Sequence, residues 1–204
     1  DHIRRRAENC AGGDVLLSVG AELSAAALGT LAAVGESSPR VFARLEVAII
    51  TTGDELVDAA ATPDTYQIRN SNAVALQGVI ESRAWMTTLA PAHVRDDVHA
   101  MIAALREAVR SADAVVLSGG VSMGHRDAVR DAVEAIGAHV VFHGLPQRPG
   151  KPMLGAVYAR ERGAIPIFGL PGNPISAMVT CERIVLPVLA TCAGRVEGHR
   201  ARAV

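Results

Sequence analysis

The seven residues SGGVSMG at positions 118–124 combine three glycines with two serine hydroxyls directly before an expected helix. Gly119 and Gly120 permit positive φ and close approach, so successive backbone N–H groups can face an anion at the helix N-terminus. The segment lacks the Gly-Lys-Ser/Thr of a P-loop and the GxGxxG spacing of a dinucleotide site. Two interpretations stay open: a plain strand-to-helix turn, or an anion site that includes Ser118 and Ser122.

Residues 169–174, GLPGNP, contain two prolines and two glycines. Asparagine is a favoured N-cap and proline fits the first helical position, so Asn173 and Pro174 predict the start of a helix. We expect the segment before them to be rigid and exposed, and Gly172, Asn173 and Pro174 to bind a ligand as well.

Arg148 and Lys151 place two cations on a loop that is stiffened by prolines. Such a pair suits phosphate or a molybdate-like oxyanion. A solvated basic turn is the alternative interpretation of the same residues.

Carboxylates stand near these loops at Glu55, Asp96 and Asp127, and Thr52 precedes the first of them. Magnesium binds through one or two carboxylates together with substrate phosphates, so carboxylates beside an anion site predict Mg²⁺. For Asp96 and Asp127 the alternative is a helix N-cap.

The elements that must position these residues alternate between strand and helix from residue 46 onward. We expect strands at 47–50, 85–89, 114–117, 140–142, 153–158 and 165–168, and helices at 72–83, 96–110, 127–136 and 174–192. This order predicts an α/β fold, a three-layer, doubly wound and mostly parallel sheet. Ligands bind beyond the carboxyl ends of the strands in such a sheet, and three of the unusual loops follow three of these strands.

Residues 1–45 have a different pattern, with a helix expected at 24–34 and short strands at 14–17 and 41–44. We interpret 1–45 as the end of a neighbouring domain, 46–194 as the α/β domain and 195–204 as a tail or linker. The chain starts with Asp1, and we therefore expect it to be a piece of a longer protein.

The composition agrees with a globular α/β protein: 204 residues, 50% hydrophobic, 3% aromatic and 20% charged, with a formal net charge of −1. This charge balance gives no support to nucleic-acid binding.

Three cysteines without a CxxC pair predict free thiols in a reducing compartment. No apolar run in the sequence approaches the roughly 18 residues of a membrane span, and no signal-peptide pattern opens the chain, so we expect a cytoplasmic protein without membrane contact.

The order and spacing of four strings across residues 46–192 resemble the MoeA family, the molybdopterin molybdenumtransferases of molybdenum-cofactor biosynthesis, which are related to the C-terminal domain of gephyrin. The four strings are Thr52-Gly-Asp-Glu-Leu56, Ser118-Gly-Gly-Val-Ser-Met-Gly124 with Asp127, Pro149-Gly-Lys-Pro152 and Gly169-Leu-Pro-Gly-Asn-Pro-Ile-Ser-Ala177. The opening of the chain resembles the end of the family's first domain.

The resemblance implies a transferase that converts adenylated molybdopterin and molybdate into molybdenum cofactor and AMP with a divalent metal such as Mg²⁺. It implies a domain similar to the MogA adenylyltransferase, a homodimer whose partner copy contributes to the active site, and a MogA-like adenylyltransferase as a further partner. We therefore expect this chain alone to bind pterin phosphate weakly and to be inactive. The implied catalytic residues are Glu55, Asp96, Asp127 and Lys151, the metal ligands are Glu55 and Asp127, and the substrate-binding residues are Thr52, Ser118, Gly119, Gly120, Ser122, Arg148, Lys151, Gly172, Asn173 and Pro174.

Two positions depart from the family pattern. Some members carry lysine where this chain has Arg148, and some show Tyr-Asp-Ser/Thr-Asn where residues 69–72 read Arg-Asn-Ser-Asn. The carboxylate becomes an amide at Asn70, which argues against a metal role there.

Two other functions stay open. One is another enzyme on the same fold, a MogA-like adenylyltransferase or a CinA-like nucleotide hydrolase, although MogA-like proteins tend to have Thr-Gly-Gly-Thr-Gly where this chain has Ser118-Gly-Gly-Val-Ser122. The other is a non-catalytic binding module like the receptor-binding domain of gephyrin.

Overall fold

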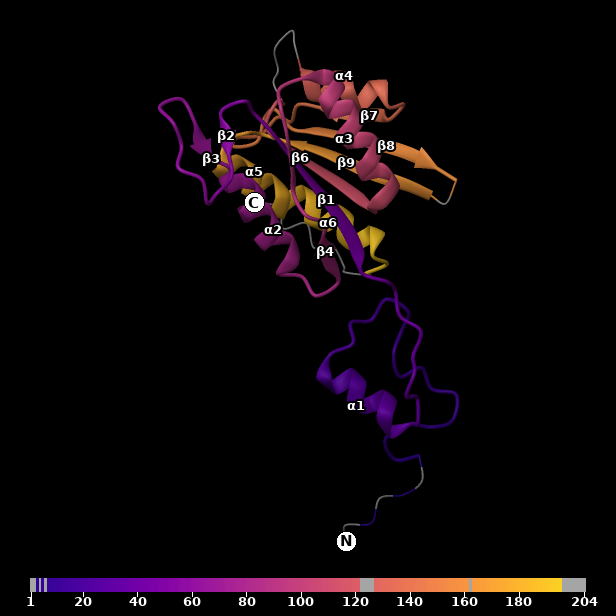
Figure 1. Cartoon of the computed structure of the whole chain (residues 1–204). Helices are drawn as coiled ribbons and strands as arrows, with labels where there is room; N and C mark the ends of the chain where they lie inside the picture. The colour runs from indigo at the N-terminus through magenta and orange to yellow at the C-terminus, as the bar shows by residue number, and fades with distance from the viewer. Residues whose placement is uncertain (1–2, 4, 6, 122–126, 162, 196–204) are drawn as a thin grey trace. The chain divides into compact units, whose positions relative to one another are not determined.

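The computed structural model describes residues 3, 5, 7–121, 127–161 and 163–195 (Figure 1). The chain divides into two compact units, Arg44–Leu189 and Asp1–Ala43 with Ala190–Val204. Each unit is described by itself, and the assignment of residues 1–45 to a neighbouring domain stays a prediction.

The larger unit is built on a sheet that has seven strands in the described part of the chain, in the order β4-β1-β6-β9-β8-β7, with β5 paired to the second half of β1. Strands β4, β5, β1, β6 and β9 run parallel, whereas β8 is antiparallel to both β9 and β7. A separate pair, β2 and β3, forms a two-stranded parallel sheet. The bounds are β1 Leu45–Thr52, β2 Leu56–Val57, β3 Ile68–Arg69, β4 Met86–Thr88, β5 Ala92–Val94, β6 Ala114–Ser118, β7 His139–His143, β8 Leu154–Arg160 and β9 Gly163–Leu170.

Helices cover both faces of this sheet, which confirms the expected mostly parallel α/β architecture (Figure 1). Side chains of α3 and α4 pack in one apolar cluster with Ile50 and Leu117, and side chains of α2 and of the last helix pack in a second cluster with Ile49 and Val116. Because neighbouring residues of β1 and β6 point to opposite faces and both faces are covered, these strands are continuous apolar runs. The bounds are α2 Ser71–Glu81, α3 Val98–Ser111 and α4 Ala128–Ala135.

The last helix runs from Pro174 to Cys192 as α5 (Pro174–Thr180), a π-helical turn η1 (Cys181–Val185) and α6 (Leu186–Cys192). Pro187 has no N–H, and its ring would clash with the carbonyl four residues earlier in a regular helix. The wider turn, in which the Leu186 N–H bonds to the Cys181 carbonyl, removes this conflict.

This helix corrects the expectation that the chain has no apolar segment of spanning length. Pro174–Cys192 has 19 residues, and by length and composition it is the one helix in the described part of the chain that could cross a membrane. Cys181, Val185 and Leu189 are fully buried in the second apolar cluster, so packing against the sheet accounts for the apolar sequence.

The buried thiol of Cys181 predicts a loss of stability at alkaline pH. Burial raises the pKa of the Cys181 thiol to about 12, and the Glu182 carboxylate adds to the rise. In the unfolded chain the Cys181 thiol ionises near pH 8.5. The contribution of the neutral, buried thiol to the free energy of unfolding is therefore complete below about pH 8.5 and is lost as the pH rises toward about 12. Over this window the free energy of unfolding should fall by up to about 1.4 kcal/mol per pH unit more in the wild type than in Cys181→Ala. Urea unfolding at about pH 7.5, 9 and 10 measures these slopes.

The exposed Cys10 provides the matched control, since Cys10→Ala should keep the wild-type slope. Equal slopes in the wild type and Cys181→Ala would contradict the prediction.

The smaller unit contains α1 (Ala25–Ala33), and Ser24 accepts a hydrogen bond from the Ala27 N–H at 3.3 Å as its N-cap. The helix ends at Ala33, close to the expected end at 34, and the N–H of Gly35 bonds to the Ala32 carbonyl. The strands predicted at 14–17 and 41–44 are wrong. A strand needs a partner for its backbone hydrogen bonds, and neither segment pairs with another described residue in a ladder.

Candidate functional site

A cavity of about 180 Å³ lies at the carboxyl ends of β1, β6 and β9, where the sequence predicted a ligand site. The loops that follow these three strands supply much of its wall, together with the segment that joins β3 to α2. The lining residues are Thr52, Gly53, Glu55, Leu56, Ile68, Arg69, Asn70, Ser71, Asn72, Asp96, Ser118, Gly119, Gly120, Gly172 and Pro174.

Close backbone contact brings the strand ends together. Gly119 has φ +95°, and a Cβ atom there would lie 2.2 Å from the carbonyl oxygen of Thr52. A Cβ at Gly172 would lie 3.6 Å from the Gly119 Cα, which is an ordinary contact distance. At position 119 only glycine allows the approach to Thr52, and with Gly172 in contact as well, the loops after β1, β6 and β9 meet at Gly119.

The side chain of Asn72, in the first turn of α2, fastens two of these loops. Its Nδ2 donates to Ser118 Oγ at 2.9 Å and to the Gly172 carbonyl at 2.8 Å. Ser118 Oγ in turn donates to the Pro171 carbonyl at 3.4 Å. Asn72 was not predicted as a functional residue. In the sequence it appears only as the last position of the family string at residues 69–72.

Asn70 plays a similar part at the end of β1. Its Oδ1 accepts the Ala73 N–H at 3.2 Å as the N-cap of α2, and its Nδ2 donates to Thr51 Oγ1 at 2.7 Å. The start of α2 is therefore tied to β1 through Asn70 and to the loops after β6 and β9 through Asn72.

The structure separates Asp96 from the capping role that the sequence left open. Asp97 caps α3 by accepting the Ala100 N–H at 2.8 Å. Asp96 lines the cavity and accepts a hydrogen bond of 2.6 Å from Thr52 Oγ1.

The loop after β1 holds Glu55 against the cavity. A Cβ atom at Gly53 would lie 2.8 Å from Glu55 Oε2, so the carboxylate folds over this glycine. His93 Nε2 lies 2.9 Å from the Gly53 carbonyl oxygen and fixes the loop from the side of β5. The short strand β5 and the role of His93 were not predicted.

Asp127 is not among the residues that line the cavity. Its Oδ1 accepts the Arg130 N–H at 3.0 Å as the N-cap of α4, and its Oδ2 lies 3.0 Å from His143 Nε2. The capping interpretation is confirmed, whereas a catalytic or metal-binding role for Asp127 stays a prediction. Ser122 lies outside the described residues.

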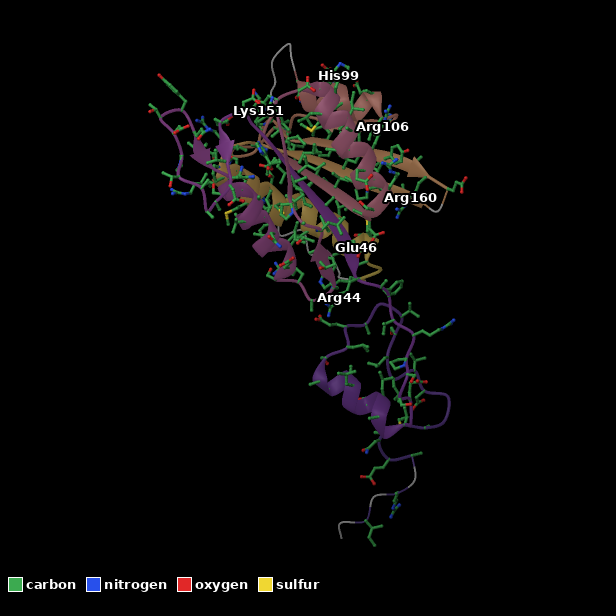
Figure 2. The ribbon with its side chains drawn as sticks, in the orientation of Figure 1. Arg44, Glu46, His99, Arg106, Lys151 and Arg160 are labelled. Carbon is green, nitrogen blue, oxygen red and sulfur yellow. The ribbon has the colours of Figure 1, made fainter. Side chains whose placement is uncertain are left out.

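Arg148 and Lys151 precede β8 and so lie at the same end of the sheet as the cavity, because β8 begins opposite the end of β9. Figure 2 shows Lys151 at the end of the sheet opposite Glu46 and Arg160. Neither Arg148 nor Lys151 lines the cavity. Among the described residues the lysine or arginine that does so is Arg69, which was not predicted as a site residue.

Asn173 has the geometry that the sequence predicted. Its Oδ1 accepts the Ser176 N–H at 3.1 Å as the N-cap of α5, with Pro174 at the first helical position. It does not line the cavity, although its neighbours Gly172 and Pro174 do.

The carboxylates fit a magnesium ion that is shared with a substrate better than one held by protein alone. No group of three or more His, Cys, Asp or Glu side chains in the described part of the chain is arranged to hold a metal. Glu55 and Asp96 line the same cavity, and one or two carboxylates plus substrate phosphates are the usual Mg²⁺ set.

Comparison with known proteins assigns the segment that contains the cavity to one family. Residues 48–191, well over half of the chain, match the sequence model of a family described as "Probable molybdopterin binding domain". The chain belongs to this molybdopterin-binding domain family. All residues that line the cavity fall inside the matched range.

Relatives of this molybdopterin-binding domain have longer chains. The chain is 32% identical to a molybdopterin molybdenumtransferase from Synechocystis over 91% of its own length and 47% of that protein. It is 35% identical to molybdopterin molybdenumtransferase 2 from Mycobacterium tuberculosis over 98% of its length and 49% of that protein. The chain thus spans about half the length of the curated relatives it matches.

A solved structure supports the same relationship for the fold. The molybdopterin biosynthesis MoeA protein from Pyrococcus horikosii superposes with a TM-score of 0.74 and 31% identity, over 88% of this chain and 43% of that one. The fold implied by the family resemblance is therefore confirmed.

Proposed function

We propose that this molybdopterin-binding domain is the part of a molybdopterin molybdenumtransferase that binds adenylated molybdopterin, and that the whole enzyme inserts molybdate with release of AMP. The observation that carries the proposal is the cavity at the strand ends, which is lined by three of the predicted loops and lies inside the family match. The names of the relatives support the transferase activity.

In this proposal the protein binds adenylated molybdopterin mainly through preorganised hydrogen-bond donors. The first turn of α2 lines the cavity at Ser71 and Asn72, and the backbone N–H groups and dipole at a helix N-terminus favour an anion there. Thr52 and Ser118 are buried and already hydrogen-bonded, so the wall needs little reorganisation when the guest binds.

Insertion of molybdate replaces oxygen ligands of molybdenum by the dithiolene sulfurs of the pterin, so the protein must hold two anions close together. Glu55 and Asp96 would hold Mg²⁺ together with phosphate oxygens, and the bound ion would neutralise charge at the adenylyl bond. The finer expectations of a homodimer, a cytoplasmic location and supply by a MogA-like adenylyltransferase stay predictions.

Anaerobic titration calorimetry with molybdopterin-AMP, with and without Mg²⁺, tests the proposal. The wild type should bind, and Mg²⁺ should strengthen binding. Glu55→Gln should weaken the Mg²⁺-dependent binding about tenfold, because a neutral amide is a poor magnesium ligand.

Glu107→Gln is the control, since Glu107 is an exposed residue of α3 paired with Arg110 and does not line the cavity. Absence of binding by the wild type under both conditions would refute the proposed function.

A further inference from the structure

Arg69 stands out in the cavity because of its charge. Glu55 and Asp96 contribute two carboxylates to the wall, and Arg69 is the one lysine or arginine that lines it among the described residues. A guest with phosphate groups needs a cation nearby to offset these carboxylates. The lysine and arginine predicted for this purpose do not line the cavity.

The backbone around Arg69 is held on both sides. Arg69 pairs with Val57 between β3 and β2, and the next residue, Asn70, donates its N–H to the Val57 carbonyl at 2.8 Å. The side chain is anchored as well, because Nε donates to the Ala61 carbonyl at 3.1 Å. This single anchor reduces the conformational entropy that the long side chain would lose on binding a ligand.

The two terminal nitrogens of Arg69 remain available. Within the described part of the chain they make no hydrogen bond or ion pair, and the residue is exposed. A guanidinium with both Nη groups available can bind two oxygens of a phosphate group side by side.

The neighbouring residues add positive potential at this position. Arg69 directly precedes Asn70, the N-cap of α2, and therefore lies at the positive end of the helix dipole. Asn70 caps the helix as a neutral amide and brings no negative charge. Arg69 and Asn70 stand where the family string described above has tyrosine and aspartate, so this chain is more positive here by two charges at neutral pH.

We infer that Arg69 is a specificity-determining residue of the cavity, which binds a phosphate group of the guest and selects phosphorylated over unphosphorylated ligands. The inference rests on the proposed function, since that function places a phosphate-bearing guest in the cavity. It concerns a residue for which the four predicted motifs gave no signal.

Binding of AMP and of adenosine, which differ only in the phosphate group, tests this inference on the whole chain. The wild type should bind AMP more tightly than adenosine, and Arg69→Gln should weaken AMP about tenfold while adenosine is unaffected. Inorganic pyrophosphate, which lacks the base, should compete with AMP on the wild type about tenfold better than on Arg69→Gln. Arg106→Gln is the matched control, because Arg106 lies on α3 and does not line the cavity (Figure 2).

Thermal unfolding of Arg69→Gln shows whether this variant is misfolded. Arg69→Lys, which keeps the positive charge, should recover part of the AMP affinity. Equal AMP and pyrophosphate binding by the wild type and Arg69→Gln overturns the inference and leaves the proposed function standing. Failure of the wild type to bind AMP, adenosine and molybdopterin-AMP overturns both.

Discussion

Gly119→Ala is expected to destabilise the larger unit by about 3 kcal/mol or more and to abolish ligand binding in the cavity. The new Cβ atom would lie 2.2 Å from the Thr52 carbonyl oxygen, which belongs to the backbone of β1 and cannot rotate away. The positive φ of +95° adds strain for any residue with a side chain. To relieve the contact the loop after β6 must move away from Thr52, and this movement opens the cavity wall.

Gly78→Ala is the matched control for this substitution. Gly78 lies inside α2, and no atom comes within 4 Å of the position that its Cβ would take. Alanine is the better helix former, so this variant should gain roughly 0.5–1 kcal/mol. Urea unfolding of both variants, with titration of AMP, measures the difference. A stability loss below about 1 kcal/mol in Gly119→Ala would show that the loop adapts and would contradict the close packing argued for this site.

The sequence predicted most of the large elements because their patterns depend on burial. Strands β1 and β6 read as apolar runs since both sheet faces are covered, and the caps Asp127 and Asn173 were correct because capping is a local interaction. The short strands β2, β3 and β5 were missed, because two or three residues give no periodic pattern. The predicted strands at 14–17 and 41–44 failed for the opposite reason, since a local pattern does not supply a strand partner.

The site was predicted at the level of loops but not of all its side chains. Thr52, Asp96 and Ser118 line the cavity as expected, because in a parallel sheet the residues at strand ends meet at one edge. Lys151 reaches the same end of the sheet and still does not line the cavity, since strand order alone does not place a side chain within a loop. Arg69 belongs to a two-residue strand and Asn72 to the first turn of the helix after it, so nothing in the periodicity linked them to the cavity.

Asn72→Asp is expected to destabilise the larger unit by about 2–4 kcal/mol and to weaken ligand binding, although the two side chains have the same shape. Asn72 uses its Nδ2 as a donor to Ser118 Oγ and to the Gly172 carbonyl. A carboxylate oxygen in this place cannot donate, and it would face the Gly172 carbonyl oxygen with like partial charge. The loops after β6 and β9 would lose their common attachment to α2.

Asn173→Asp provides the control, because it makes the same chemical change where the opposite atom matters. Asn173 uses its Oδ1 to accept the Ser176 N–H as the N-cap of α5, and a carboxylate accepts this bond equally well. The added negative charge at a helix N-terminus is favourable, so the stability of this variant should stay within about 0.5 kcal/mol of the wild type. Urea unfolding of the two variants side by side therefore separates the loss of a donor from the gain of a charge. Equal effects of the two substitutions would show that charge, rather than the bridge made by Asn72, determines the stability of the cavity wall.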